Sequence, residues 1–159
     1  MNQKFHELDK QLWPQQWISA WTLLLVALGA TINSMKILPP ERVFKSAWFS
    51  KAARKANISD RVLCLAIGQV MNGQADDLGG GVFKKRVNDN MHRSIILARA
   101  GQWWIYQYLF AKKDRDNIAD DELLAFRRLA DVYAKLTTAA LDQLIQDQEL
   151  MEICHGNQA

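Results

Sequence analysis

The stretch VFKKRVNDNMHRSIILARAGQWWIYQYLFA, residues 82–111, decides the fold of this chain. It holds three runs rich in β-branched and aromatic residues, a composition typical of strands, and short connections separate the runs. We predict strands over 82–87, 93–99 and 103–111, with the last two joined by a tight turn at 100–102. Connections this short join antiparallel neighbours, so the three runs predict an antiparallel sheet.

The segments on either side of these strands show helical periodicity. Their apolar residues recur at spacings of three and four, and Ser59 and Thr137 are well placed to cap the helices that follow. The expected elements are a strand at 42–46, helices at 47–56, 60–72, 120–136 and 138–148, and a final edge strand at 150–154. The sequence therefore predicts an α+β fold, a small antiparallel sheet with helices packed on it.

The chain distributes its charge unevenly. Its 159 residues are 49% hydrophobic and 23% charged, a composition typical of one globular domain with one core. Residues 41–116 contain 14 Lys and Arg against 7 Asp and Glu, whereas residues 117–159 contain 3 against 8. The basic middle indicates a surface that faces a polyanion. The alternative is that these charges are spread over a solvated surface.

The first forty residues differ from the rest of the chain. No charged residue occurs in the segment 11–35, and the run at 17–32 is the most apolar one. This run is shorter than the roughly 20 residues that a spanning helix needs. It is either a weak membrane or export segment, or a translated leader that precedes a start at Met35. We therefore divide the chain into an appendage at 1–40 and a domain at 41–159, and we expect no membrane contact.

The two cysteines, Cys64 and Cys154, lie far apart in the sequence and show no spacing typical of a metal site. We interpret both as reduced, largely buried thiols of a cytoplasmic protein. The glycines at 79–81 are not followed by the Lys and Ser or Thr of a phosphate-binding loop. The sequence thus predicts no metal and no small-molecule cofactor.

Cationic and aromatic side chains gather on the three strands. Because alternate residues of a strand point to opposite faces, Lys84 and Arg86 share one face and Lys85 lies on the other. By the same rule His92 and Arg93 lie on opposite faces of the next strand. One side of the third strand is expected to carry Tyr106, Tyr108, Phe110 and Lys112. Basic residues among aromatic ones favour nucleic acid, because cations bind phosphates and aromatic rings stack on bases.

A structural interpretation of the same strands stands beside this one. The aromatic residues can be core, and the lysines can simply keep a sheet edge soluble. The strands contain no paired carboxylates and no metal ligands, so any chemistry must use His, Tyr, Lys and Arg. RNA can be cut in this way, since a base takes the 2′-OH proton, cations stabilise the phosphate and an acid protonates the leaving oxygen. His92 suits proton transfer at neutral pH, although a single histidine is more often structural.

Several motifs follow one another in a specific order: WFSKAARK, SDRVL, DLGGGVFKKRV, YLFAKKDRDNI and DDELLAFRRLA. Each is weak alone, but their order and spacing from Val43 to Cys154 resemble the RelE/ParE toxin superfamily of type II toxin–antitoxin systems, in its RelE-like branch. The resemblance implies a RelE-like toxin fold, a cognate antitoxin and, for RelE-like members, ribosome-dependent cleavage of mRNA. It does not extend over residues 1–40.

The resemblance also implies roles for individual residues. Its basic strand falls on Lys84, Lys85 and Arg86, its next arginine on Arg93, its tyrosine and lysine on Tyr108 and Lys112, and a further arginine on Arg115. We predict Lys85, His92, Arg93 and Tyr108 as catalytic, and Lys84, Arg86, Lys112 and Arg115 as RNA-binding. His155 is a further candidate near the last strand. Related sequences have a longer glycine-rich loop in place of residues 88–91, and an aromatic residue in place of His92.

Three functions fit these observations. The leading one is an endoribonuclease toxin that cuts mRNA on the ribosome. The second is a toxin that cuts nothing and poisons a protein such as DNA gyrase, as ParE-like relatives do. The third is an inactive antitoxin-binding or DNA-binding module. The cluster of cations beside His and Tyr favours the first, and an acidic antitoxin segment laid across the same cations would inhibit it.

Overall fold

The computed structural model describes residues 41–99 and 102–155. The elements are β1 (Arg42–Ser46), α3 (Ala47–Lys55), α4 (Asp60–Met71), β2 (Asp76–Asp77), β3 (Val82–Val87), β4 (His92–Arg99), β5 (Trp103–Ala111), α5 (Asp120–Ala134), α6 (Thr138–Gln146) and β6 (Leu150–Ile153). The predicted appendage at 1–40 and the centre of the turn between β4 and β5 lie outside the described residues. The division of the chain at residue 40 thus stays a prediction.

The strands form one mixed sheet in the order β2-β3-β4-β5-β1-β6. The pairs β3–β4 and β4–β5 are antiparallel, as their short connections predict. β1 lies between β5 and β6 and pairs parallel with β5. A parallel pair needs a long crossover, and here two helices and three strands separate β1 from β5 in the sequence. The sheet is therefore mixed, while the predicted α+β class is confirmed.

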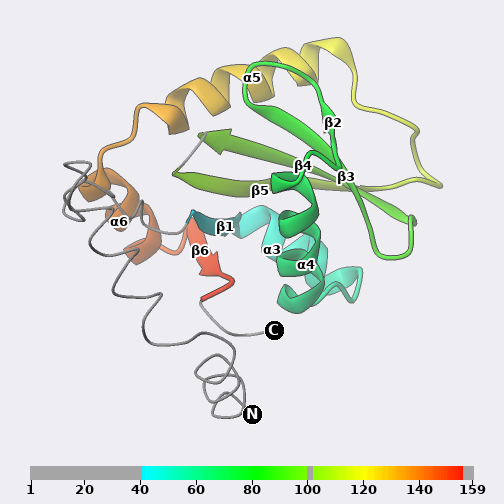
Figure 1. The fold of residues 1–159 in the computed structure, drawn as a ribbon, viewed down its shortest axis with the longest axis horizontal. Coiled ribbons are helices and arrows are strands. Elements are labelled where there is room, and N and C mark those ends of the chain that lie inside the picture. Colours follow the sequence, from blue (N-terminus) through cyan, green and yellow to red (C-terminus); the bar gives the residue numbers. More distant parts are fainter. Residues whose placement is uncertain (1–40, 100–101, 156–159) are drawn as a thin grey trace, which may run out of the picture. The chain divides into compact units, whose positions relative to one another are not determined.

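Helices cover both faces of the sheet (Figure 1). α3 and α4 pack on one face, and α5 and α6 on the other. The first core includes Phe49, Leu63, Ile67, Ile96 and Tyr106. The second includes Phe44, Ile95, Leu97, Ile105 and Leu141. Consecutive residues of β4 thus enter different cores, because side chains alternate across a strand.

Polar side chains fix the helix starts. The hydroxyls of Ser59 and Thr137 accept hydrogen bonds from backbone N–H groups in the first turns of α4 and α6, at 3.4 and 3.1 Å, so both predicted caps are confirmed. α5 begins after Ala119, which has no capping oxygen. The Glu122 carboxylate accepts from the Ala119 N–H at 2.7 Å instead. The acidic first turn of α5 also complements the helix dipole.

Tyr106 and Tyr108 lie on opposite faces of the sheet, so the prediction that they share one side of β5 is wrong. In the register of β4 and β5, Ile95 pairs with Tyr108 but Ile96 pairs with Tyr106, which leaves Gln107 as an extra residue in a β-bulge. Because of this extra residue, Tyr106 and Tyr108 point to opposite faces of the sheet although they are two positions apart. Tyr106 is fully buried against α4, where its hydroxyl donates to the Leu63 carbonyl at 2.8 Å and burial raises its pKa.

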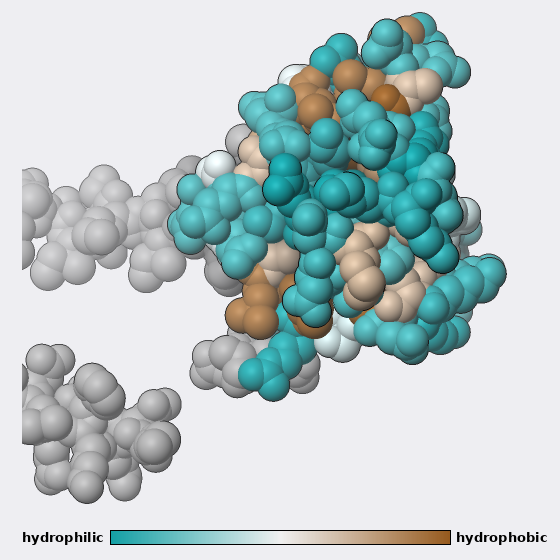
Figure 2. Space-filling view, turned by 90° about the vertical axis from the view of Figure 1, so that its right-hand side faces the viewer, coloured by the Kyte–Doolittle hydropathy of each residue, from teal (hydrophilic) through white to brown (hydrophobic). Residues whose placement is uncertain are grey.

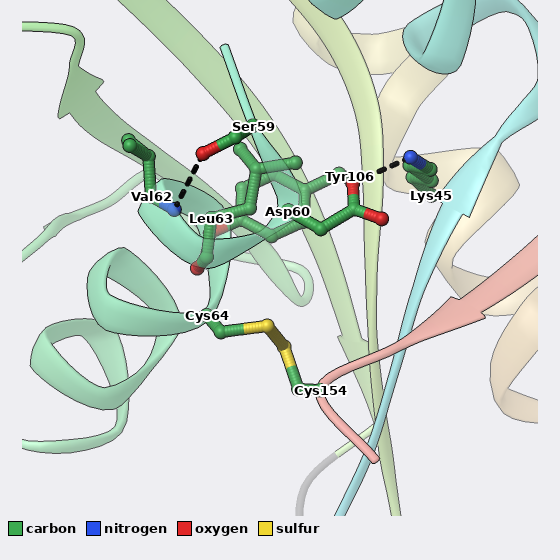
Figure 3. The surroundings of a disulfide bond; sticks show 8 residues. All are labelled: Lys45, Ser59, Asp60, Val62, Leu63, Cys64, Tyr106 and Cys154. Carbon is green, nitrogen blue, oxygen red and sulfur yellow. Dashed lines mark hydrogen bonds and ion pairs between the residues drawn. A yellow bond between two sulfur atoms is a disulfide. The ribbon is translucent and has the colours of Figure 1, made fainter. Parts of the chain in front are cut away.

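A disulfide joins Cys64 of α4 to Cys154, the residue after β6, with the two Cα atoms 5.5 Å apart (Figure 3). The prediction of two reduced thiols is therefore wrong. No local pattern in the sequence indicates this pair, because 90 residues separate the two cysteines and only the packing of α4 beside the edge strand brings them together. The bond ties the last strand to the helix layer on the α3/α4 face.

Candidate nucleic-acid interface

Five predicted site residues gather on the α5/α6 side of the strand ends; we call them the basic face. They are Lys84, Arg86, Arg93, Tyr108 and Arg115. The sheet register brings the first four together, since it pairs Arg86 with Arg93, Lys84 with Ile95 and Ile95 with Tyr108. These residues come from three different strands. Their proximity is therefore a property of the fold and of the bulge in β5.

Arg86 and Arg93 are direct cross-strand partners. The Arg93 side chain is 8% exposed, and its Nη1 donates to the carbonyls of Asn90 and His92 at 2.9 and 3.1 Å. Arg86 is exposed. Within residues 41–99 and 102–155 neither arginine forms an ion pair. Like charges directly opposite each other destabilise a sheet, and a bound anion would remove this cost.

Lys84 and Arg115 are the other two cations of the basic face, beside Arg86 and Arg93. The Lys84 ammonium lies 3.4 Å from the Asp76 carboxylate and donates to the Asn117 side chain at 3.3 Å. The Arg115 guanidinium forms a two-pronged ion pair with Glu122 and lies 5.5 Å above the Phe110 ring. The guanidinium lowers the pKa of Glu122 to about 2, chiefly through these hydrogen bonds. Glu122 in turn, with a smaller effect of Tyr108, raises the pKa of Arg115.

Tyr108 belongs to an aromatic group that sequence reasoning missed in part. Its ring stacks on the Trp48 ring, with centroids 4.7 Å apart and planes 23° apart, and lies 5.7 Å from Phe126. Trp48 is 50% exposed. We expected Trp48 only as part of the apolar stripe of its helix. The parallel pairing of β1 with β5, which carries Trp48 to Tyr108, has no local signal in the sequence.

Two predicted catalytic residues, Lys85 and His92, lie on the other face of the sheet. The Lys85 ammonium donates to the Gln74 carbonyl at 2.7 Å, and its pKa is lowered by burial and, to a smaller extent, by Arg86. The Nδ1 of His92 lies 3.2 Å from the Asn88 amide nitrogen. The structure therefore separates Lys85 and His92 from Arg93 and Tyr108, as the alternation within β3 and β4 requires.

The remaining candidates are elsewhere. Lys112 lies, with His92, in the wall of a cavity at the ends of β4 and β5. His155 lines a small cavity next to the disulfide, together with residues of α4 and β6, and none of the basic-face residues lines that cavity.

Figure 2 shows the side of the molecule that lies at the right of Figure 1, with the β3–β4 turn and the segment after β5. Hydrophilic residues cover most of this side.

The described part of the chain lacks two kinds of feature. It contains no group of three or more His, Cys, Asp or Glu residues that could hold a metal ion. None of its helices combines the length and the apolar character needed to cross a membrane.

Most of the chain matches a known protein family. A family model described as the RelE toxin of the RelE/RelB toxin–antitoxin system matches residues 41–153. No curated protein and no solved structure matches the chain significantly. The matched range contains every element described above, from β1 to β6. The chain therefore belongs to the RelE toxin family and is a toxin of a toxin–antitoxin system, with a cognate antitoxin as its partner.

Proposed function

We propose that this toxin is a metal-independent endoribonuclease that cuts mRNA on the ribosome and so stops translation. The observation that carries the proposal is the pair Arg86 and Arg93, which lie opposite each other on two strands and have no ion-pair partner in the described part of the chain. A phosphate of RNA supplies the missing negative charge. Arginine suits this task because its planar fork donates two parallel hydrogen bonds to phosphate oxygens.

The residues of the basic face then bind the RNA phosphates and a base. Arg86, Arg93 and Lys84 hold the scissile phosphate and stabilise the charge that develops on it. Arg115 lies beside Tyr108 and, with Glu122 fixing its guanidinium, can reach a neighbouring phosphate. The exposed Trp48 and its partner Tyr108 offer a surface on which a base stacks.

Proton transfer requires a group that can both donate and accept. On the basic face the Tyr108 hydroxyl is such a group, whereas guanidinium and ammonium groups only donate hydrogen bonds. We therefore assign proton transfer to Tyr108 in place of His92, which lies across the sheet. The cognate antitoxin would inhibit the toxin by laying an acidic segment over the same cations.

The test is induction of the chain in growing cells, with cleavage sites mapped by primer extension. We expect wild-type protein to arrest growth and cut translated transcripts. The variant Lys84→Ala/Arg86→Ala should reduce cleavage roughly 100-fold or more, because each donor to a transition-state charge contributes on that scale. The control, Lys51→Ala/Arg54→Ala, removes two exposed cations of α3 and should act like wild type.

Two further variants separate the possible assignments. Tyr108→Phe should keep RNA binding and lose cleavage. Lys85→Ala changes the residue between Lys84 and Arg86 that points to the opposite face, so a loss as large as that of the double variant would contradict the basic face as the site. Growth arrest with intact mRNA would overturn the proposal and favour a toxin that binds a protein target such as gyrase.

A further inference from the structure

A second group of cations surrounds a cavity of about 620 Å³, which we call the lysine cavity. Its walls come from the end of α3, the β3–β4 turn and the end of β5. They include Lys55, Lys112, Lys113, His92, Asp89 and Met91. Three of these residues are lysines and one is an aspartate. The volume falls within the range of pockets that bind small organic ligands.

The wall formed by the β3–β4 turn has an unusual backbone. Asn88, Asp89 and Asn90 have φ angles of 54°, 49° and 69°, so three consecutive residues are left-handed. Asn and Asp tolerate this region better than other residues, yet each such residue carries strain, and strained backbone clusters at functional sites. The Arg93 guanidinium supports the turn by donating to the Asn90 carbonyl.

The orientation of His92 is fixed by the same turn. The Asn88 amide nitrogen donates to the Ala56 carbonyl at 3.4 Å and lies 3.2 Å from His92 Nδ1. A carbonyl oxygen only accepts and an amide nitrogen only donates, so Nδ1 is the acceptor. The neutral ring then carries its proton on Nε2. The cavity wall therefore includes the His92 ring together with the exposed Met91.

The lysine cavity and the basic face lie on opposite faces of the sheet, next to the same ends of β4 and β5. His92 lines the cavity while the next residue, Arg93, belongs to the basic face, and Ala111 lines the cavity while Phe110 lies under Arg115. A chain bound at the basic face needs only to pass the end of β5 to enter the cavity. Lys112 and Lys113 lie at that point.

We propose that the lysine cavity binds a nucleotide of the RNA strand that flanks the scissile phosphate. The ammonium groups of Lys55, Lys112 and Lys113 hold its phosphate, and its base lies against Met91 and the His92 ring. This inference rests on the proposed function, because it takes the RNA at the basic face as given. Continuity with that face favours RNA over an acidic protein segment as the occupant.

The experiment measures binding directly, so that it does not depend on cleavage. Fluorescent 2′-O-methyl oligonucleotides of two and six nucleotides cannot be cut through the 2′-OH, and the purified full chain is titrated into each. For Lys55→Gln/Lys113→Gln we expect about ten-fold weaker binding of the six-nucleotide probe, with binding of the dinucleotide unchanged. The slope of log K against log salt for the longer probe should fall by roughly 1.4, about 0.7 for each charge lost.

Matched variants test whether a loss of RNA affinity has another cause, namely a general loss of positive charge or a folding defect. Lys51→Gln/Lys135→Gln removes two exposed lysines outside the cavity and should bind both probes like wild type. Lys55→Arg/Lys113→Arg should restore most of the lost affinity, which a folding defect would not allow. Thermal unfolding of each variant checks that the fold is intact.

The outcomes distinguish the two proposals. If Lys55→Gln/Lys113→Gln binds the six-nucleotide probe like wild type, the cavity is no RNA subsite, whatever the basic-face variants do. If that variant loses affinity only for a polyglutamate peptide, the cavity takes an acidic protein segment and the proposal is overturned. If wild type binds with the expected length dependence but never cuts mRNA, the cavity proposal stands and the endoribonuclease proposal fails.

Discussion

The two faces of the central sheet are covered in different ways. On one face, α3 and α4 place well-buried side chains against the strands: Phe49, Ala53, Leu63, Ala66, Ile67 and Val70. On the other face, Ala130 is the buried hydrophobic residue of α5 and Leu141 that of α6, while most of their apolar contacts are half-buried. The disulfide and the buried Tyr106 hydroxyl also belong to the first face.

This difference separates stability from binding. The α3/α4 face holds the sheet through deep burial and a covalent bond. On the α5/α6 face the exposed Arg86 lies directly opposite the largely buried Arg93, and like charges in this position repel each other. Neither arginine forms an ion pair within the described residues, so this part of the surface contributes little to folding and is available to a polyanion. The comparison predicts that changes on the two faces have separable effects.

The largest expected effect is on stability, from removal of the disulfide. Cys64→Ser/Cys154→Ser should lower the free energy of unfolding by about 2–4 kcal/mol, because the unfolded chain is no longer constrained by a bond that closes a long loop. Urea unfolding measures this change. Reductant should destabilise the wild type by a similar amount and leave the variant unaffected. RNA cleavage by this variant, measured well below its unfolding temperature, should be unchanged. If cleavage falls together with stability, the two faces are coupled and the separation of stability from binding is wrong.

Trp48→Ala is expected to have a smaller effect, and it should affect RNA binding more than stability, the reverse of the disulfide variant. The exposed ring stacks on Tyr108 at the border of the basic face, and stacking on a base contributes about 1–3 kcal/mol, so RNA affinity should fall roughly ten-fold. The free energy of unfolding should change by less than about 1.5 kcal/mol, the scale of one aromatic pair. Leu65→Ala changes an even more exposed apolar residue, in α4; it is the control and should leave RNA affinity unchanged.

Local patterns in the sequence predict most of this fold. The strands at 82–87 and 103–111 and the caps Ser59 and Thr137 follow from alternation, turn chemistry and short connections, all of which act within a few residues. The alternation also separates Lys85 from Lys84 and Arg86. The family motifs pointed to the basic face, although they did not show which of its residues meet.

Features that depend on distant parts of the chain were missed. The bulge at Gln107 reverses the expected side of Tyr108, and it arises from the pairing of two strands. The disulfide needs α4 beside β6. The stack of Trp48 on Tyr108 needs β1 inserted next to β5. No single segment contains the information for these contacts, since each depends on packing across the whole sheet.

The smallest expected effect concerns the strongest ion pair of the basic face, Arg115 with Glu122. Arg115 lowers the pKa of Glu122 to about 2, below the roughly 4.3 of an unfolded glutamate. A lowered folded pKa means that the pair stabilises the fold above pH 4.3 or so and loses this contribution as the pH falls towards 2. Because the Glu122 side chain is 34% exposed, solvent screens the pair and the contribution is small. Glu122→Gln should therefore be slightly less stable than wild type at neutral pH, by urea unfolding, and the difference should vanish at acidic pH. A large difference at neutral pH would mean that the basic face supports folding after all, and that the division between the two faces is wrong.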